Sequence, residues 1–133
     1  MPHRLELKNN GGVIVIDDAY NSNPEGAAEA LRVLGSLQGR RRILITPGMV
    51  ELGENEYAAN RELGRVAAPH CDDVIAVGRV RDALFEGLDS EGFPEQRRHA
   101  VKNLREALAL LPQLLTGSSA VLLENDLTDD MES

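Results

Sequence analysis

Short runs of branched apolar residues alternate along this chain with segments whose apolar residues recur every three or four positions. The runs at residues 13–16, 43–46, 73–77 and 120–123 are typical of strands buried on both faces of a sheet. Strands that alternate with helices pair in parallel through right-handed crossovers. The pattern therefore predicts one α/β domain with a mostly parallel sheet.

The remaining segments complete this arrangement. Residues 4–8 alternate polar and apolar, so they are predicted to form an N-terminal β-ribbon with residues 13–16. Residues 98–101 form a further short strand. Helices are predicted from Pro24, with Asn23 as N-cap, to near Gln38-Gly39, then at residues 56–68 and 80–88, and from a cap at Asn103 to about Leu111. The expected fold is a three-layer, Rossmann-like domain with helices on both faces.

The core is predicted to be aliphatic. The chain has two Phe, two Tyr and no Trp among its 133 residues, so Leu, Val, Ile and Ala must fill the interior. In the last predicted helix, Leu104, Leu108 and Leu111 fall at helical spacing. We expect this series to face the core.

Charge and composition exclude several classes of partner. The formal net charge is −8, with 22 acidic and 14 basic residues, so nucleic acid is not expected to bind. The densest basic run, Arg40-Arg41-Arg42, directly precedes an apolar strand and is interpreted as a solvated strand entrance. No apolar run approaches the roughly 20 residues that cross a bilayer, so no membrane is expected as a partner.

Cysteine and histidine usage points to a reducing, cytoplasmic setting without a metal site. Cys71 is the only cysteine, and His3, His70 and His99 are not spaced like zinc ligands. His70 and Cys71 are adjacent, but neighbouring residues rarely face each other as a nucleophile and its base. We expect a surface histidine next to a buried cysteine.

Ligands of open α/β sheets bind outside the carboxyl ends of the strands. In this sequence those ends are followed by polar or turn-forming segments: residues 17–23, residues 46–53, Gly78 and residues 124–126. The segment Asp17-Asp18-Ala19-Tyr20-Asn21-Ser22-Asn23-Pro24 is the most informative. It places carboxylates, a phenol and amides between a strand and a helix start, which suits a nucleotide. The alternative is that these residues only cap and turn the chain.

Two stretches carry a resemblance to a known family. They read GGVIVIDDAYNSNPEGAAEAL and RRILITPGMVELGENEYAANRELGRVA. Both resemble the carboxy-terminal domain of Mur ligases, most of all in the branch that adds D-alanyl-D-alanine to a UDP-muramoyl-tripeptide. The resemblance covers about the first half of the chain, and HRLELKNNGG also fits the ribbon of that family. It implies a domain at residues 1–128, followed by an acidic tail at residues 129–133.

The resemblance implies a function for the domain as one part of a larger ligase. In that family ATP, with magnesium, phosphorylates a carboxylate of a UDP-muramoyl-peptide, and the amine of an amino acid or dipeptide then attacks the acyl phosphate. The chain contains no G-x-x-x-x-G-K-[ST] phosphate loop, so no catalytic residue is assigned within it and it is expected to be inactive alone. Closure of this domain over the nucleotide would exclude water.

The same resemblance implies which residues meet which substrate. The nucleotide would be contacted by Asp18, Tyr20, Asn21 and Asn23. The amine substrate would lie nearer Gly48, Met49, Glu51, Asn125 and Asp126. The alternative for Glu51 is a purely structural role, as the first residue of the turn before Gly53.

Three departures from the family pattern bear on the amine substrate. Thr46-Pro47-Gly48 replaces a Gly-Asp pair, Asn60 stands where a histidine is usual, and Glu124-Asn125-Asp126 stands where Lys-Gly-Ser is usual. The last change replaces a cation with two carboxylates. We therefore expect a divergent ligase whose amine substrate carries a free cationic end that pairs with Glu124 or Asp126.

Two alternatives belong to other functional classes. A receiver-like signalling module also alternates strands and helices and carries paired acids such as Asp17-Asp18, but it needs an Asp after a middle strand and a Lys near the last. Thr46 and Glu124 stand near those places here. A non-catalytic binding module on a Rossmann-like scaffold is the other alternative, because fold alone does not fix function.

Overall fold

The computed structural model describes residues 6–10, 13–18, 24–37, 39–49, 53–115 and 118–124. The strands are β1 (Glu6–Asn10), β2 (Val13–Asp18), β3 (Arg41–Thr46), β4 (Asp73–Val77), β5 (Arg98–Val101) and β6 (Ser119–Glu124). The α-helices are α1 (Pro24–Gly35), α2 (Glu56–Ala67), α3 (Arg81–Ser90) and α4 (Leu104–Leu114). Short 3-10 turns are η1 (Gly53–Asn55), η2 (Ala68–His70) and η3 (Glu95–Arg97).

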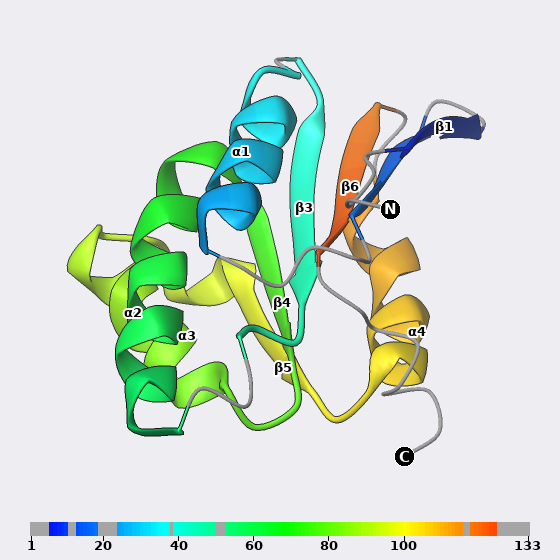
Figure 1. The fold of residues 1–133 in the computed structure, drawn as a ribbon. Coiled ribbons are helices and arrows are strands. Elements are labelled where there is room, and N and C mark those ends of the chain that lie inside the picture. The colour runs from blue at the N-terminus through cyan, green and yellow to red at the C-terminus, as the bar shows by residue number, and fades with distance from the viewer. Residues whose placement is uncertain are drawn as a thin grey trace.

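The six strands form one sheet in the order β1-β2-β6-β3-β4-β5. β1 pairs with β2 antiparallel, which confirms the predicted ribbon, and all other neighbours are parallel. The last strand in the sequence, β6, lies between β2 and β3 (Figure 1). Strands that are separated by about 70 residues or more in the chain are thereby hydrogen-bonded to one another at the centre of the sheet.

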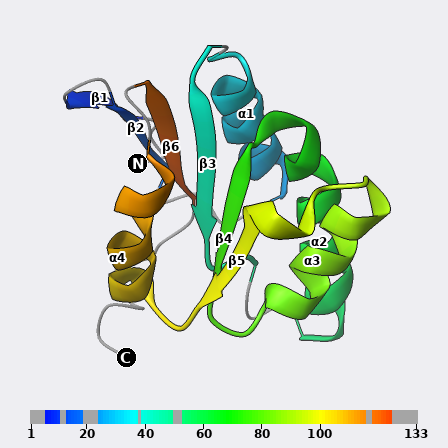
Figure 2. The ribbon, with the colours of Figure 1, turned by 180° about the vertical axis from the view of Figure 1, so that it is seen from behind.

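Helices cover both faces, as the sequence predicts. α1, α2 and α3 pack on one face, and α4 alone lies on the other (Figures 1 and 2). Neighbouring residues of a strand serve different faces, since Leu44 belongs to the core under α1 to α3 whereas Ile43 and Ile45 belong to the core under α4. Helices on both faces of the sheet confirm the expected three-layer arrangement. Aliphatic side chains predominate in both cores, as the composition predicts.

The buried stripe of α4 differs from the predicted one. Leu104 and Ala107 are buried, and Leu111 and Leu114 pack partly against the same core. Leu108 is 44% exposed, so its predicted core position was wrong. A single helix on a flat sheet face buries a narrow stripe, and here that stripe follows positions 104, 107, 111 and 114.

Helix ends also differ from the prediction. α1 ends at Gly35, before the expected Gln38-Gly39, and α4 continues through Pro112 to Leu114. Proline removes one backbone donor, but Leu115 N–H still donates to the carbonyl of Leu111 at 3.1 Å. The last turn of α4 therefore tolerates the proline.

α2 and α3 meet through a pair of glycines. A Cβ built on Gly64 would lie 2.1 Å from the carbonyl oxygen of Leu84, and one on Gly87 would lie 1.9 Å from that of Arg61. Real Cβ atoms do not approach a backbone oxygen this closely, so neither position accepts a larger residue without movement. The two helix backbones are in direct contact as a result.

A partly buried ion pair links two neighbouring strands near their amino-terminal ends. Nε of Arg41 donates to Oδ2 of Asp73 at 2.6 Å, and this hydrogen bond raises the pKa of Arg41. The Asp73 side chain is 1% exposed. Its other oxygen lies 3.7 Å from Nε2 of His99 on β5. Polar and charged side chains of β3, β4 and β5 are therefore gathered at this end of the sheet, away from the carboxyl ends of the strands.

No helix in the part of the chain that the structure describes is both long and apolar enough to span a membrane.

We predict that Gly87→Ala lowers the free energy of unfolding by about 3 kcal/mol, because the added methyl group would press on the backbone of α2. Helix propensity alone predicts the opposite sign, a gain of about 1 kcal/mol. Chemical denaturation followed by circular dichroism separates the two.

Gln113→Ala serves as the control, since Gln113 is an exposed residue of α4. Its effect should stay within about 0.5 kcal/mol. Equal or greater stability of Gly87→Ala relative to the parent protein would contradict direct contact between the helix backbones.

Candidate functional site

The carboxyl ends of three neighbouring strands form the candidate site. In the sheet register Asp18 of β2 lies opposite Glu124 of β6, and Ile45 of β3 lies opposite Leu123. The strand ends lie along the lower edge of the sheet in Figure 1. Three of the polar segments that the sequence singled out therefore start from adjacent positions, while Gly78 follows β4, one strand beyond β3.

The segment after β3 is held in a fixed turn. Gly48 N–H donates to Oγ1 of Thr46 at 2.9 Å, and Thr46 is fully buried. Gly48 has a φ of +76°, and a Cβ there would lie 2.4 Å from Oδ1 of Asn60 and 2.7 Å from Cγ2 of Val80. Only glycine meets both the backbone angle and the available space. Thr46 and Gly48 thus fix how the chain leaves β3.

Asn60 holds the next residue of this turn. Its Oδ1 accepts from the backbone N–H of Met49 at 2.7 Å, and its Nδ2 donates to the carbonyls of Met49 at 2.7 Å and Glu56 at 2.9 Å. The Asn60 side chain is buried at 1% exposure. One amide therefore satisfies three backbone groups and ties the segment after β3 to the first turn of α2.

The sequence analysis did not identify Asn60 as a site residue. The signal that could have revealed it is its place on the buried face of α2, one turn before Leu63 and Gly64 and two turns before Ala67. A polar residue on such a face needs internal hydrogen-bond partners.

The start of α2 is also tied to the loop after β4. Nη2 and Nε of Arg79 donate to the two carboxylate oxygens of Glu56 at 2.8 and 3.1 Å. This bidentate geometry is the stronger form of an arginine–carboxylate pair, although Arg79 is 69% exposed and solvent weakens it. The loops after β3 and β4 are thus joined through α2.

The structure places three of the nine predicted site residues. Asp18 is the last residue of β2, at the edge where the site was predicted. Gly48 and Met49 lie at the same edge but are buried, Met49 at 2% exposure within the core between α1 and α2. Contact of Asp18 with a nucleotide, and of Gly48 and Met49 with an amine substrate, stays a prediction. Tyr20, Asn21, Asn23, Glu51, Asn125 and Asp126 lie outside the described residues.

Cys71 does not form a nucleophilic site with His70. The thiol is buried, and desolvation raises the pKa of Cys71 far above its ordinary value. Burial, together with the positive charges of Arg42 and Arg32, lowers the pKa of His70. The expected arrangement of a buried cysteine is confirmed, while His70 packs partly buried against Gly35.

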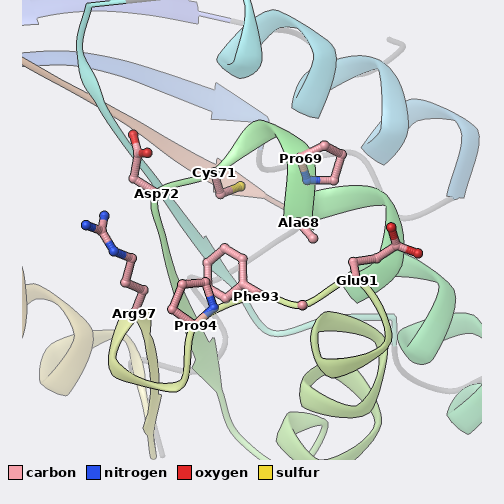
Figure 3. A pocket seen from close by; sticks show the side chains of 9 residues that line it. Ala68, Pro69, Cys71, Asp72, Glu91, Phe93, Pro94 and Arg97 are labelled. Carbon is pink, nitrogen blue, oxygen red and sulfur yellow. The ribbon is translucent and has the colours of Figure 1, made fainter.

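An open hollow of about 470 Å³ lies next to Cys71, before the start of β4. In Figure 3 Asp72 and Arg97 lie on one side of it and Glu91 on the other, with Phe93 and Pro94 between. This hollow belongs to the amino-terminal edge of the sheet, opposite the candidate site. It therefore contributes nothing to chemistry at the carboxyl ends.

Within the described ranges, no three His, Cys, Asp or Glu side chains gather where they could hold a metal ion.

Comparison with known proteins identifies the family. The model of the family described as "Mur ligase, glutamate ligase domain" matches residues 3–124. UDP-N-acetylmuramoyl-tripeptide–D-alanyl-D-alanine ligase of Bacillus subtilis (strain 168) is 36% identical over 87 residues, which are 63% of this chain and 19% of that protein. The ligase of the same name from Mycobacterium tuberculosis (strain H37Rv) is 34% identical over 99 residues, 68% of this chain and 19% of that protein. The chain spans about a fifth of the length of these relatives.

Solved structures agree. A crystal structure of MurF from Acinetobacter baumannii superposes with a TM-score of 0.80 at 28% identity, covering 97% of this chain and 28% of that one. MurF ligase from Thermotoga maritima, in complex with ADP, has the same fold at a TM-score of 0.71 and 20% identity, covering 99% of this chain and 29% of that one. With a family match that extends from the β-ribbon to the end of β6, the chain belongs to the Mur ligase, glutamate ligase domain family.

Proposed function

We propose that this chain is the carboxy-terminal domain of an ATP-dependent ligase that forms an amide bond in a peptidoglycan precursor. The family match and the names of the relatives support this proposal. The observation that carries it is the position of β6 between β2 and β3, because it makes the three polar strand ends direct neighbours at one edge. A single substrate assembly can reach all three from that edge.

The proposed reaction has two steps. The γ-phosphoryl group of ATP passes to a carboxylate oxygen of a UDP-muramoyl-peptide, and ADP is released. The nitrogen lone pair of the incoming amine then attacks the acyl carbon, the amine loses a proton, and inorganic phosphate leaves as the amide forms. A domain that closes over this site protects the acyl phosphate from water.

The positions of the described residues support a secondary role for this domain in ATP binding. Asp18 is the last residue of β2, and α1 begins six residues later, so both lie at the edge where a nucleotide binds in open α/β sheets. The sequence has no glycine-rich phosphate loop. We therefore assign the phosphates and magnesium to another part of the ligase, with Asp18, Tyr20, Asn21 and Asn23 meeting the nucleotide from this side.

The amine substrate is assigned to the ends of β3 and β6. Glu124 ends the strand between β2 and β3, and Asn125 and Asp126 follow it in the sequence. Carboxylates at this place favour an amine substrate with a second, cationic group. We propose an amino acid or dipeptide of this kind, with Gly48, Met49 and Glu51 on the other side of it, in a cytoplasmic enzyme.

We predict that nucleotide binding by this chain is weak and centred on the segment after β2. Titration with a non-hydrolysable ATP analogue should shift the amide resonances of residues 17–23, and Asp18→Ala or Asn21→Ala should reduce affinity about fivefold or more through loss of a charged or polar contact. Shifts restricted to other loops would contradict the assignment.

The isolated chain is predicted to release no ADP from ATP and to form no amide. The reason is that the phosphates require a loop that its sequence does not contain. A coupled assay for ADP, run with UDP-muramoyl-tripeptide and D-alanyl-D-alanine, measures this. Turnover above the buffer blank would overturn the assignment of phosphate binding to another part of the ligase.

Asn60 is predicted to control the position of the segment after β3. Asn60→Ala should lower the free energy of unfolding by about 2–4 kcal/mol, because it removes the hydrogen bonds that the amide makes to the N–H and carbonyl of Met49 and to the carbonyl of Glu56. Asn60→His should recover part of this loss, since an imidazole can donate one hydrogen bond and accept another.

Chemical denaturation and the amide shifts of Thr46 to Met49 provide the measurement. Asn60→Asp tests the donors separately, because a carboxylate cannot donate to the two carbonyls. A loss below about 0.5 kcal/mol for Asn60→Ala would show that the amide does not hold this turn.

A further inference from the structure

A second crevice lies at the carboxyl edge, separate from the ends of β2, β6 and β3. β4 and β5 are parallel neighbours, but the helices that follow them pack on opposite faces of the sheet. α3 follows β4 on one face and α4 follows β5 on the other (Figures 1 and 2). The two connections diverge and leave space between them, which is the geometry of a ligand site in open α/β folds.

The crevice has a volume of about 580 Å³. Residues at the end of β5, Gly78 after β4, and charged residues of the two loops and helix starts line it. The lining residues are Gly78, Arg79, Arg81, Asp82, Ala100, Val101, Lys102 and Glu106. Its size suits one small ligand rather than a polymer.

Two cationic side chains are available in this crevice. Lys102 makes no ion pair with any residue that the structure describes, and Arg81 has only a 3.7 Å contact with the 85% exposed side chain of Asp82. Arg79 contributes further positive charge, although its guanidinium is bound to Glu56. In a chain of net charge −8, the lining has three basic and two acidic residues, which is a small local excess of positive charge.

The acidic residues of the lining offset this charge only in part. Oε1 of Glu106 accepts from the backbone N–H of Lys102 at 2.8 Å, and Glu106 N–H donates to Oδ1 of Asn103 at 2.9 Å. Glu106 is thus engaged in capping α4. Asp82 and Glu106 are the two carboxylates of the lining that would oppose an anion, and the Glu106 carboxylate is held by the backbone N–H of Lys102.

α3 adds backbone donors to the same place. Its N-cap is Val80, whose side chain cannot accept a hydrogen bond, and no side chain caps the first turn. The N–H groups of this turn require an acceptor from solvent or a ligand. Together with the two cations, they favour a small anion with several oxygens.

We propose that the crevice between the β4–α3 and β5–α4 connections binds a phosphate group, held by Arg81, Lys102 and the first turn of α3. This site goes beyond the proposed ligase chemistry, because it lies at the other end of the edge from Asp18. The phosphate can be free or part of a small phosphorylated metabolite, since the recognition chemistry is the same.

The test is titration of the isotope-labelled chain with inorganic phosphate, followed through its amide resonances. Saturable shifts should be concentrated at residues 78–82 and 102–106, and sodium chloride at equal ionic strength should not reproduce them. Arg81→Gln and Lys102→Gln should each weaken binding about fivefold or more through loss of a charge-assisted contact. Asp82→Asn should strengthen it.

Arg32→Gln is the matched control, because it removes the same charge from an exposed residue in the last turn of α1. It should leave phosphate affinity unchanged. Shifts that are scattered, equal with chloride, or unaffected by both Arg81→Gln and Lys102→Gln would overturn the proposal. Glucose 6-phosphate and ribose 5-phosphate distinguish free phosphate from a phosphorylated metabolite by their relative affinities.

An ATP analogue is expected to shift residues 17–23, whereas phosphate is expected to shift residues 78–82 and 102–106. The experiment can therefore contradict the nucleotide proposal and the phosphate proposal independently. Loss of phosphate binding in Lys102→Gln with unchanged nucleotide shifts would support two distinct sites. Loss of both phosphate binding and the nucleotide shifts in Lys102→Gln would overturn the proposal of a separate site, because it would place Lys102 in the nucleotide site.

Discussion

The hydrogen bonding of β6 to both β2 and β3 is the constraint on which the rest of the structure depends. Without it the β-ribbon would have no connection to the remaining parallel strands, because β2 pairs with β6 on one side and β1 on the other. The register places Asp18 beside Glu124 and brings the end of β3 next to both. The candidate site is therefore a product of strand order rather than of any one motif.

Around that edge, positions are fixed by contacts between backbone and a few small or polar groups. Asn60 joins the segment after β3 to α2, and Arg79 joins the start of α2 to the loop after β4. Gly64 and Gly87 then bring the backbones of α2 and α3 into contact. A displacement at the end of β3 would thus reach α3 through packed or hydrogen-bonded groups, which gives the two halves of the edge a physical route for coupling.

Much of the fold follows from hydrophobic period alone. Buried strands such as β4 carry a continuous apolar run, here residues 74–77, and α2 shows a clear helical pattern, so both were predicted within a few residues. Strand order could not be predicted, since every parallel strand here presents a similar apolar surface to its neighbours. Leu108 was misplaced because spacing gives the helical stripe but not its rotation toward the sheet. Asn60 was not recognised because its partners are backbone groups, which no side-chain motif records.

The central place of the last strand also has a consequence for synthesis on the ribosome. A nascent chain that has not yet released Ser119–Glu124 exposes unpaired backbone on the facing edges of β2 and β3. Open edges of this kind recruit strands from other molecules. The interval between translation of α4 and emergence of β6 is therefore the time at which this domain is most prone to aggregate, and at which a chaperone would benefit it most.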